Sequence, residues 1–333
     1  MTLGSTLYSF FEDYLKCQKG LRPASVRSYR DALRLFLQFV SNDRRRALTR
    51  LSLSDLTFDR TVRFLKGLEE NRSNHGRTRN HRLAVLRTFF DYVATREPEM
   101  LSEASRVVVI PTKRVAPPET HFLGQDELHT IFAGLPKTGR FSLRDHALLL
   151  FLYNTGARVQ EVADLRVENL RLEAHPHVHL HGKGDKWRIC PIWPDTVNIL
   201  TRLLREGTGT SSPDAPVFAS HRGAALTRFG IYKIVRRHTH HFVTQQPRPW
   251  RISPHVFRHT TAVHLLETGV DPNVIRGWLG HVSLDTTNRY AEITLRTKEA
   301  ALQRCEPPIS SEGFPRKPVW RDDQNLLKWL NSL

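Results

Sequence analysis

Residues 255–259 read His-Val-Phe-Arg-His. Offsets of three and four residues place His255, Arg258 and His259 on one face of a helix. Pro254 suits the first turn of that helix, and Ser253 before it is a candidate N-cap. The stretch therefore predicts a helix that begins at Pro254 and gathers two imidazoles and a guanidinium on one side.

Two further groups follow this helix at fixed distances along the chain. The pair Gly280-His281 comes first, and Tyr290 comes shortly afterwards in the sequence Asn-Arg-Tyr. An arginine is a planar fork that grips phosphate oxygens, and a histidine can move protons near neutral pH. Arginine and histidines near a tyrosine hydroxyl therefore suit chemistry at a phosphate.

Two motifs lie upstream. Residues 155–162 read Thr-Gly-Ala-Arg-Val-Gln-Glu-Val, and residues 182–188 read Gly-Lys-Gly-Asp-Lys-Trp-Arg between two predicted strands, as in a hairpin turn. In this order and spacing the four motifs resemble the signature of the tyrosine recombinases, the phage integrase family. Phe257 departs from the family pattern, in which leucine is commoner.

This resemblance implies a role for each matching residue. Arg158 and Arg258 would neutralise the non-bridging phosphate oxygens, and Tyr290 would be the nucleophile that forms a 3′-phosphotyrosyl bond. The resemblance also implies that His255 is the base, Lys183 is the acid and His281 donates a hydrogen bond to the phosphate. Glu161 and His259 would support these residues. Three alternatives stay open: Lys186 as the acid, a purely structural His259, and a surface salt bridge of Arg158 with Glu161 or Asp164.

Hydrophobic periodicity predicts a mainly α-helical chain with a small β-hairpin. Four amphipathic helices near residues 7–15, 23–40, 60–69 and 83–93 form an N-terminal bundle. The proline-rich and basic segment after Val107 reads as a linker. By resemblance, we expect a SAM-like core-binding domain at 1–112, a linker at 113–120, an α+β catalytic domain at 121–300 and a tail at 301–333.

The charge of the chain points to a polyanionic partner. The 333 residues carry a net charge of +17, and basic residues exceed acidic ones in both predicted domains. Two basic domains joined by a tether suit a clamp on double-stranded DNA. Recombination breaks four strands, so the resemblance implies a homotetramer on two duplexes, with or without paralogous recombinases.

The polar faces of the N-terminal bundle are rich in basic side chains that could contact DNA. Arginine, asparagine and histidine gather there, and such residues contact phosphates and base edges. A solvated helix face is the alternative for this group, whose predicted DNA-binding members are Arg72, Arg77, Arg79 and Arg82.

Three scattered cysteines offer no disulfide framework and no zinc pattern, and they fit a reducing cytoplasm. No apolar run approaches the length of a membrane span, and no secretory signal is evident. A row of alternating histidines, residues 175–181, could attract zinc, but no cysteine or suitably spaced carboxylate completes a site. We therefore expect a cytoplasmic enzyme that needs no metal, ATP or other cofactor.

The resemblance leaves several functions open. The first is an integrase or transposase of a mobile element, and the second is an Xer-like resolvase of replicon dimers. A type IB topoisomerase, a non-catalytic DNA-binding regulator on the same fold and a metal-dependent nuclease are further alternatives. In the tail, leucines at 326, 327 and 330 predict a short helix that docks either on a neighbouring protomer or on its own domain.

Overall fold

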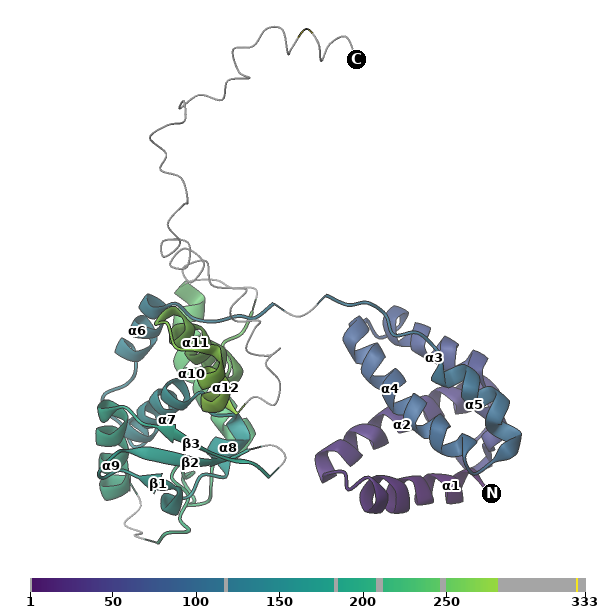
Figure 1. Ribbon diagram of the computed structural model, residues 1–333, viewed down its shortest axis with the longest axis horizontal. Helices are drawn as coiled ribbons and strands as arrows, with labels where there is room; N and C mark the ends of the chain where they lie inside the picture. Colours follow the sequence, from purple (N-terminus) through teal and green to yellow (C-terminus); the bar gives the residue numbers. More distant parts are fainter. Residues whose placement is uncertain are drawn as a thin grey trace. The chain divides into compact units, whose positions relative to one another are not determined.

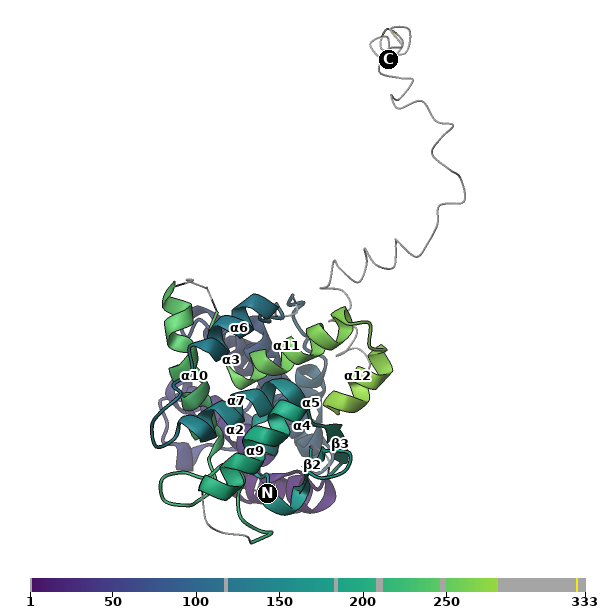
Figure 2. The ribbon, with the colours of Figure 1, turned by 90° about the vertical axis from the view of Figure 1, so that its left-hand side faces the viewer.

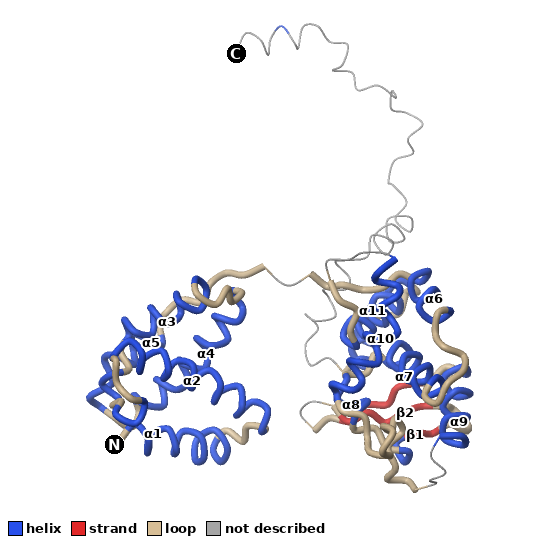
Figure 3. Tube along the Cα trace, turned by 180° about the vertical axis from the view of Figure 1, so that it is seen from behind, coloured by secondary structure: helices blue, strands red, loops and turns tan. Residues whose placement is uncertain are grey.

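The computed structural model describes residues 2–116, 119–182, 185–207, 212–245, 250–280 and 328. The chain divides into two compact units, Met1–Pro118 and Glu119–Leu333. Figure 1 draws both units, and Figure 3 colours strands only in the second one. No helix in the described part of the chain has the length and apolar character needed to cross a membrane.

The first unit is a helical bundle. Its α-helices are α1 (Leu3–Ser9), α2 (Pro23–Arg44), α3 (Phe58–Glu70), α4 (Gly76–Ala94) and α5 (Leu101–Val108). A π-helical segment, Phe10–Gln18, continues α1, and short 3-10 turns lie at Leu48–Arg50, Leu53–Asp55 and Pro98–Met100. Local chemistry sets several ends: Pro23 occupies the first turn of α2, and the Thr57 hydroxyl accepts the Arg60 N–H to cap α3.

The four helices predicted for this unit are confirmed, but α5 is a fifth that the sequence did not reveal. The apolar run that begins at Val107 was expected to open the linker, yet α5 extends to Val108. Val107 and Ile110 are buried in the core of the bundle. The helix has only eight residues, too few for a clear helical period, and the β-branched run at its end obscured it.

Aromatic side chains fill the centre of the first unit. Phe10, Phe36, Phe89 and Phe90 are fully buried. The rings of Phe10 and Phe89 meet edge to face at 5.1 Å, which joins the π-helical segment to α4. The bundle therefore gives α4 a fixed inner face.

The second unit combines helices with a small sheet. Its helices are α6 (Gln125–Ala133), α7 (Ser142–Thr155), α8 (Val159–Ala163), α9 (Pro194–Gly207), α10 (Arg228–Gln245), α11 (Pro254–Glu267) and α12 (Pro272–Leu279). A 3-10 turn at Val167–Asn169 precedes the first strand, β1 (Leu170–Arg171). Helix α7 is buried along most of its length and packs against both α9 and α11. Figure 2 shows α12 close to β3, in agreement with the contacts between them.

The sheet is antiparallel, with the order β1, β2 (His177–His181) and β3 (Trp187–Pro191). Leu180 pairs with Arg188, and His179 pairs with Ile189. Side chains alternate, so that Val178, Leu180 and Cys190 are buried while Trp187 and Ile189 are exposed. The predicted hairpin is confirmed: strands expected at 178–182 and 187–192 lie at 177–181 and 187–191.

The alternating histidines lie partly as expected. His177, His179 and His181 occupy alternate positions of β2 and so share its outer face, whereas His175 precedes the strand with φ of 62°. Among the described residues, no group of three or more histidine, cysteine, aspartate or glutamate side chains could hold a metal ion. The predicted docking segment of the tail lies outside the described residues, apart from position 328.

Candidate active site

Helix α11 begins at Pro254, as predicted, and presents Arg258 to the interior of the second unit. Arg258 is 3% exposed, and its guanidinium donates to the Gly156 and Leu279 carbonyls, each at 2.7 Å. Ser253 stands at the N-cap, but its side chain makes no capping hydrogen bond. Its carbonyl instead accepts the N–H groups of Val256 and Phe257. The suggestion of a hydroxyl cap was therefore wrong.

Arg158 reaches the same place from the turn after α7. That turn depends on Gly156, which has φ of +56° and lies so close to α12 that a Cβ would be 2.5 Å from Leu279 Cδ2. The Arg158 side chain donates from Nη1 to Glu161 Oε1 at 2.9 Å and from Nη2 to the Gly280 carbonyl at 2.9 Å. Its side chain keeps 30% of its surface exposed. The salt bridge with Glu161 that was considered as an alternative exists, and the Arg158 side chain is still partly exposed.

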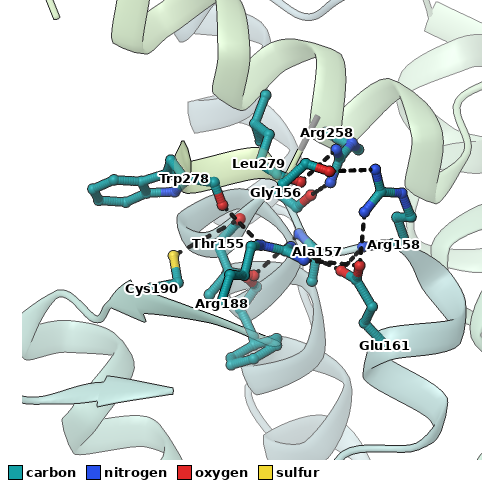
Figure 4. A network of polar contacts seen from close by, with 12 residues as sticks. Thr155, Gly156, Ala157, Arg158, Glu161, Arg188, Cys190, Arg258, Trp278 and Leu279 are labelled. Atoms are coloured by element: carbon teal, nitrogen blue, oxygen red, sulfur yellow. Dashed lines mark hydrogen bonds and ion pairs between the residues drawn. The ribbon is translucent and has the colours of Figure 1, made fainter. Parts of the chain in front are cut away.

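Arg188 is a third guanidinium at this place, and the sequence analysis assigned no role to it. It donates to both oxygens of Glu161, at 2.8 and 2.7 Å, and from Nε to the Trp278 carbonyl at 2.8 Å. Figure 4 shows Arg158 and Arg188 meeting the carboxylate of Glu161 from different elements. The signal that could have revealed it is its position on β3, where its neighbours Trp187 and Ile189 point outward.

The end of α12 accepts hydrogen bonds from all three arginines. Trp278, Leu279 and Gly280 are consecutive, and their carbonyls accept from Arg188, Arg258 and Arg158 in turn. The last carbonyls of a helix lack partners within it and carry partial negative charge, so cations are favourable there. The helix end therefore holds three positive groups side by side, directly before position 281.

Glu161 balances part of this charge from a buried position, with 3% of its surface exposed. Burial alone would raise the pKa of Glu161, but the hydrogen bonds and charges of Arg188 and Arg158 outweigh it and hold that pKa below its ordinary value. Glu161 is therefore ionised at neutral pH. Three arginines and one carboxylate leave the cluster with a net positive charge, as binding of a phosphodiester requires.

Two of the histidines of α11, His255 and His259, lie beside the cluster. The rings of His255 and His259 are 5.1 Å apart and nearly perpendicular. His255 is exposed to solvent, yet surrounding protein atoms partly desolvate its ring and lower its pKa, and the charges of Arg258 and Arg158 lower it further. A neutral imidazole near pH 7 can accept a proton.

Three predicted site residues, Lys183, His281 and Tyr290, lie outside the described residues. The backbone next to two of them is described. Gly182 closes the hairpin turn by donating to the Lys186 carbonyl at 2.7 Å, and Gly280 ends α12 with φ of +64°. Lys186, the alternative acid, is exposed.

The predicted DNA-binding arginines differ from one another. Arg72 and Arg77 are exposed, whereas Arg82 is half-buried with a pKa that burial and the nearby charge of Arg72 lower. Arg79 is only 7% exposed and donates to the Pro111 carbonyl at 3.1 Å. The expectation that Arg79 faces outward is wrong, because its side chain turns under the segment that leaves the bundle.

Comparison with known proteins shows which family models match the two units. Residues 121–296 match the model of the phage integrase family, and residues 9–97 match the phage integrase N-terminal SAM-like domain. A protein of Sinorhizobium fredii (strain NGR234) named as an integrase/recombinase, y4rC, is 34% identical over 100% of this chain and 98% of its own length. The tyrosine recombinase XerC of Pelobacter propionicus is 30% identical over 89% of this chain and 94% of its own.

A solved structure shares the fold. The XerH site-specific recombinase bound to a palindromic difH substrate superposes with a TM-score of 0.67 at 22% identity, over 84% of this chain and 79% of that one. The family model covers more than half of the chain, and the motifs that carried the resemblance lie within the matched residues. The chain therefore belongs to the phage integrase family and is a tyrosine-type site-specific recombinase.

Proposed function

We propose that Arg158 and Arg258 of the arginine cluster bind the scissile phosphate of a specific DNA site and that Tyr290 attacks it. The observation that carries this proposal is the convergence of Arg158, Arg258 and Arg188 on the end of α12, directly before His281. Arg158 and Arg258 neutralise the non-bridging oxygens, whose negative charge otherwise repels a nucleophile. Glu161 and His259 support this arrangement.

The chemistry needs a proton acceptor and a proton donor. A tyrosine hydroxyl has an ordinary pKa of about 10 and is mostly protonated at neutral pH, so His255 takes its proton as the oxygen attacks phosphorus. The new bond joins the tyrosine oxygen to the 3′-phosphate, and the bond from phosphorus to the 5′ oxygen breaks. Lys183 protonates that leaving oxygen, and His281 donates a hydrogen bond to the phosphate.

The second half of the reaction reverses the first. The 5′-hydroxyl of a partner strand attacks the phosphotyrosyl bond, restores a phosphodiester and releases Tyr290. Bond energy is kept in the ester throughout, so the cycle consumes no ATP and needs no metal. Because all four strands are cut, we propose that four protomers act on two duplexes.

DNA as the partner is supported by charge and by related proteins. The chain has a net charge of +17, and neighbours of the same fold were solved with DNA, among them XerH and the Tn1549 transposon integrase. We propose that both units, which divide near residue 118, contact the duplex. We place this activity in the cytoplasm, where the DNA lies.

For the biological role we propose an integrase of a mobile element. Two different relatives named as integrase/recombinase, y4rC and y4rD, come from one strain of Sinorhizobium fredii, and y4rD is 41% identical over 78% of this chain. The presence of two such proteins in one strain supports the proposal that this chain acts together with paralogous recombinases. The XerC relatives keep resolution of replicon dimers as the second candidate role.

A trapped covalent intermediate tests the proposed function. A nicked suicide duplex built from the DNA that flanks the gene loses its 5′-hydroxyl fragment after cleavage, so the enzyme should stay attached to the 3′ end. The adduct should form in EDTA, and Tyr290→Phe should bind the same duplex without forming it. An adduct in the Tyr290→Phe protein would overturn the nucleophile. Cleavage that stops in EDTA and leaves no adduct would favour the metal-dependent nuclease.

A further inference from the structure

Arg188 ties three elements of the active site together, although no step of the proposed reaction uses it. Its side chain starts on β3, holds Glu161 of α8 through both Nη atoms and holds the end of α12 through Nε. Only 9% of the side chain is exposed, against 30% for Arg158. Arg188 thus contacts the groups around the proposed phosphate site, and its guanidinium is turned toward protein.

The close fit around Arg188 favours arginine at this position. A planar guanidinium can hold a carboxylate at two points and a carbonyl at a third, whereas a lysine offers one compact charge. The backbone of α12 lies directly on the side chain, since a Cβ on Gly280 would be 3.1 Å from Arg188 Cδ. A shift of Arg188 would therefore move both the Glu161 carboxylate and the residue before His281.

Glu161, whose position Arg188 fixes, in turn contacts Arg158 and lies against the hairpin. Its carboxylate accepts both the backbone N–H and the Nη1 of Arg158, at 2.7 and 2.9 Å. A Cβ on Gly182 would lie 3.2 Å from Glu161 Oε1, so the same carboxylate touches the base of the turn that precedes Lys183. With Arg188 present, Glu161 shares its charge between two guanidinium groups.

We propose that Arg188 is a positioning residue that occupies Glu161 and thereby leaves the guanidinium of Arg158 available to the scissile phosphate. This inference rests on the proposed function. Without Arg188, the buried carboxylate has Arg158 as its remaining guanidinium partner, draws it inward and cancels its charge. Arg188 therefore acts on the phosphate through Glu161 and Arg158.

The charge balance gives the inference a directional test. Arg188→Met removes one positive charge and leaves Glu161 only partly paired. A second change, Glu161→Gln, removes the negative charge, restores the net charge of the cluster and frees Arg158. If Arg188 only stabilised the fold or touched the phosphate itself, the second change would leave cleavage equally slow or make it slower.

The experiment measures single-turnover cleavage of the suicide duplex by the wild type, Arg188→Met, Arg188→Lys and the double variant. A misplaced catalytic group costs about 10²-fold in rate, so Arg188→Met should cleave about 10²-fold more slowly with unchanged DNA affinity. The double variant should recover about tenfold of that loss, and Arg188→Lys should be intermediate. A double variant no faster than Arg188→Met overturns the inference.

Arg144 provides a matched control at the opposite end of α7. It also donates twice to a buried carboxylate, Asp145, and once to a backbone carbonyl, that of Ala219. Arg144→Met should lower the melting temperature while the folded protein cleaves at the wild-type rate; an equal loss of cleavage would make the Arg188 effect merely structural. Should Arg188→Met not fold, Arg188→Lys and the double variant, which buries no half-paired charge, carry the comparison. Absence of the wild-type adduct would instead refute the proposed function.

Discussion

Arginines in both units donate hydrogen bonds to backbone carbonyls, but two of those in the second unit also share a buried carboxylate. In the first unit, Arg79 and Arg87 of α4 hold the carbonyls of Pro111 and Ile110, so that α4 anchors the chain as it leaves the bundle. In the second unit, three arginines hold the end of α12 and two of them share the carboxylate of Glu161. An anchor needs only the carbonyls, whereas a site for phosphate needs guanidinium groups whose charge and orientation are set by a further residue.

The largest effect should separate Arg158 from Arg79. Losing one preorganised contact to a developing charge costs about 10²–10³ in rate, so Arg158→Ala should lower cleavage by that factor while DNA binding persists. Arg79→Met should leave the cleavage rate of the folded protein unchanged and lower stability by about 1–3 kcal/mol, since the Pro111 carbonyl loses its donor. Single-turnover cleavage and thermal melting of both variants check this. Equal losses of cleavage would erase the distinction between anchor and active site.

The next effect concerns pH and belongs to the second unit alone. His255 must be neutral to accept the proton of the tyrosine, and its pKa is lowered from an ordinary value of about 6.5. The cleavage rate should therefore be level near pH 7 and fall tenfold per pH unit only below the lowered pKa. A pH profile of single-turnover cleavage measures this. An acid limb already present at or above pH 6.5 would remove His255 as the base.

A smaller effect concerns the salt dependence of DNA affinity, which should distinguish exposed from buried arginines of the first unit. Each phosphate contact adds about 0.9 to the slope of log affinity against log salt concentration. The exposed Arg72 should contribute such a contact, so Arg72→Ala should reduce the slope by about that amount. The buried Arg79 should contribute none, and Arg79→Met should keep the slope. If Arg79→Met changed the slope and Arg72→Ala did not, the assignment within this unit would be reversed.

The smallest effect concerns a thiol beneath the arginine cluster. Burial raises the pKa of Cys190 to about 12, so its thiolate is scarce at neutral pH, whereas Cys17 is exposed. Iodoacetamide should label Cys17 and spare Cys190 in the folded protein, with cleavage unchanged. Peptide mass mapping reads out both positions. Rapid labelling of Cys190 would show that β3 and α7 separate in solution.

Motif spacing predicted which described residues of the candidate site lie close together, whereas helix periodicity missed α5 in the first unit. Among the described residues, His255, Arg258, Arg158 and Glu161 lie close together at the start of α11 and at the start of α8. Prolines, glycines and turn-forming residues close in sequence to these side chains set the local backbone, so that the sequence alone predicts where the side chains lie.

The features that sequence missed depend on partners far along the chain. Arg188 gains its role from Glu161 and from the carbonyl of Trp278, and no pattern within β3 reveals either contact. Arg79 lies on a helix whose polar face reads as solvated, but the chain near Pro111 covers it. Tertiary packing decides whether a charged side chain is buried, and hydrophobic periodicity does not reveal that packing.

Mapping the residue that becomes attached to DNA tests the assignment of Tyr290 as the nucleophile. The wild-type adduct with the suicide duplex would be digested with nuclease and protease, and the modified peptide identified by mass spectrometry. The account predicts a 3′-phosphonucleotide on Tyr290 and, in the Arg158→Ala protein, the same adduct at about 10²–10³-fold lower rate. Attachment to another residue, such as Tyr232, or an Arg158→Ala protein that forms the adduct at the wild-type rate, would contradict it.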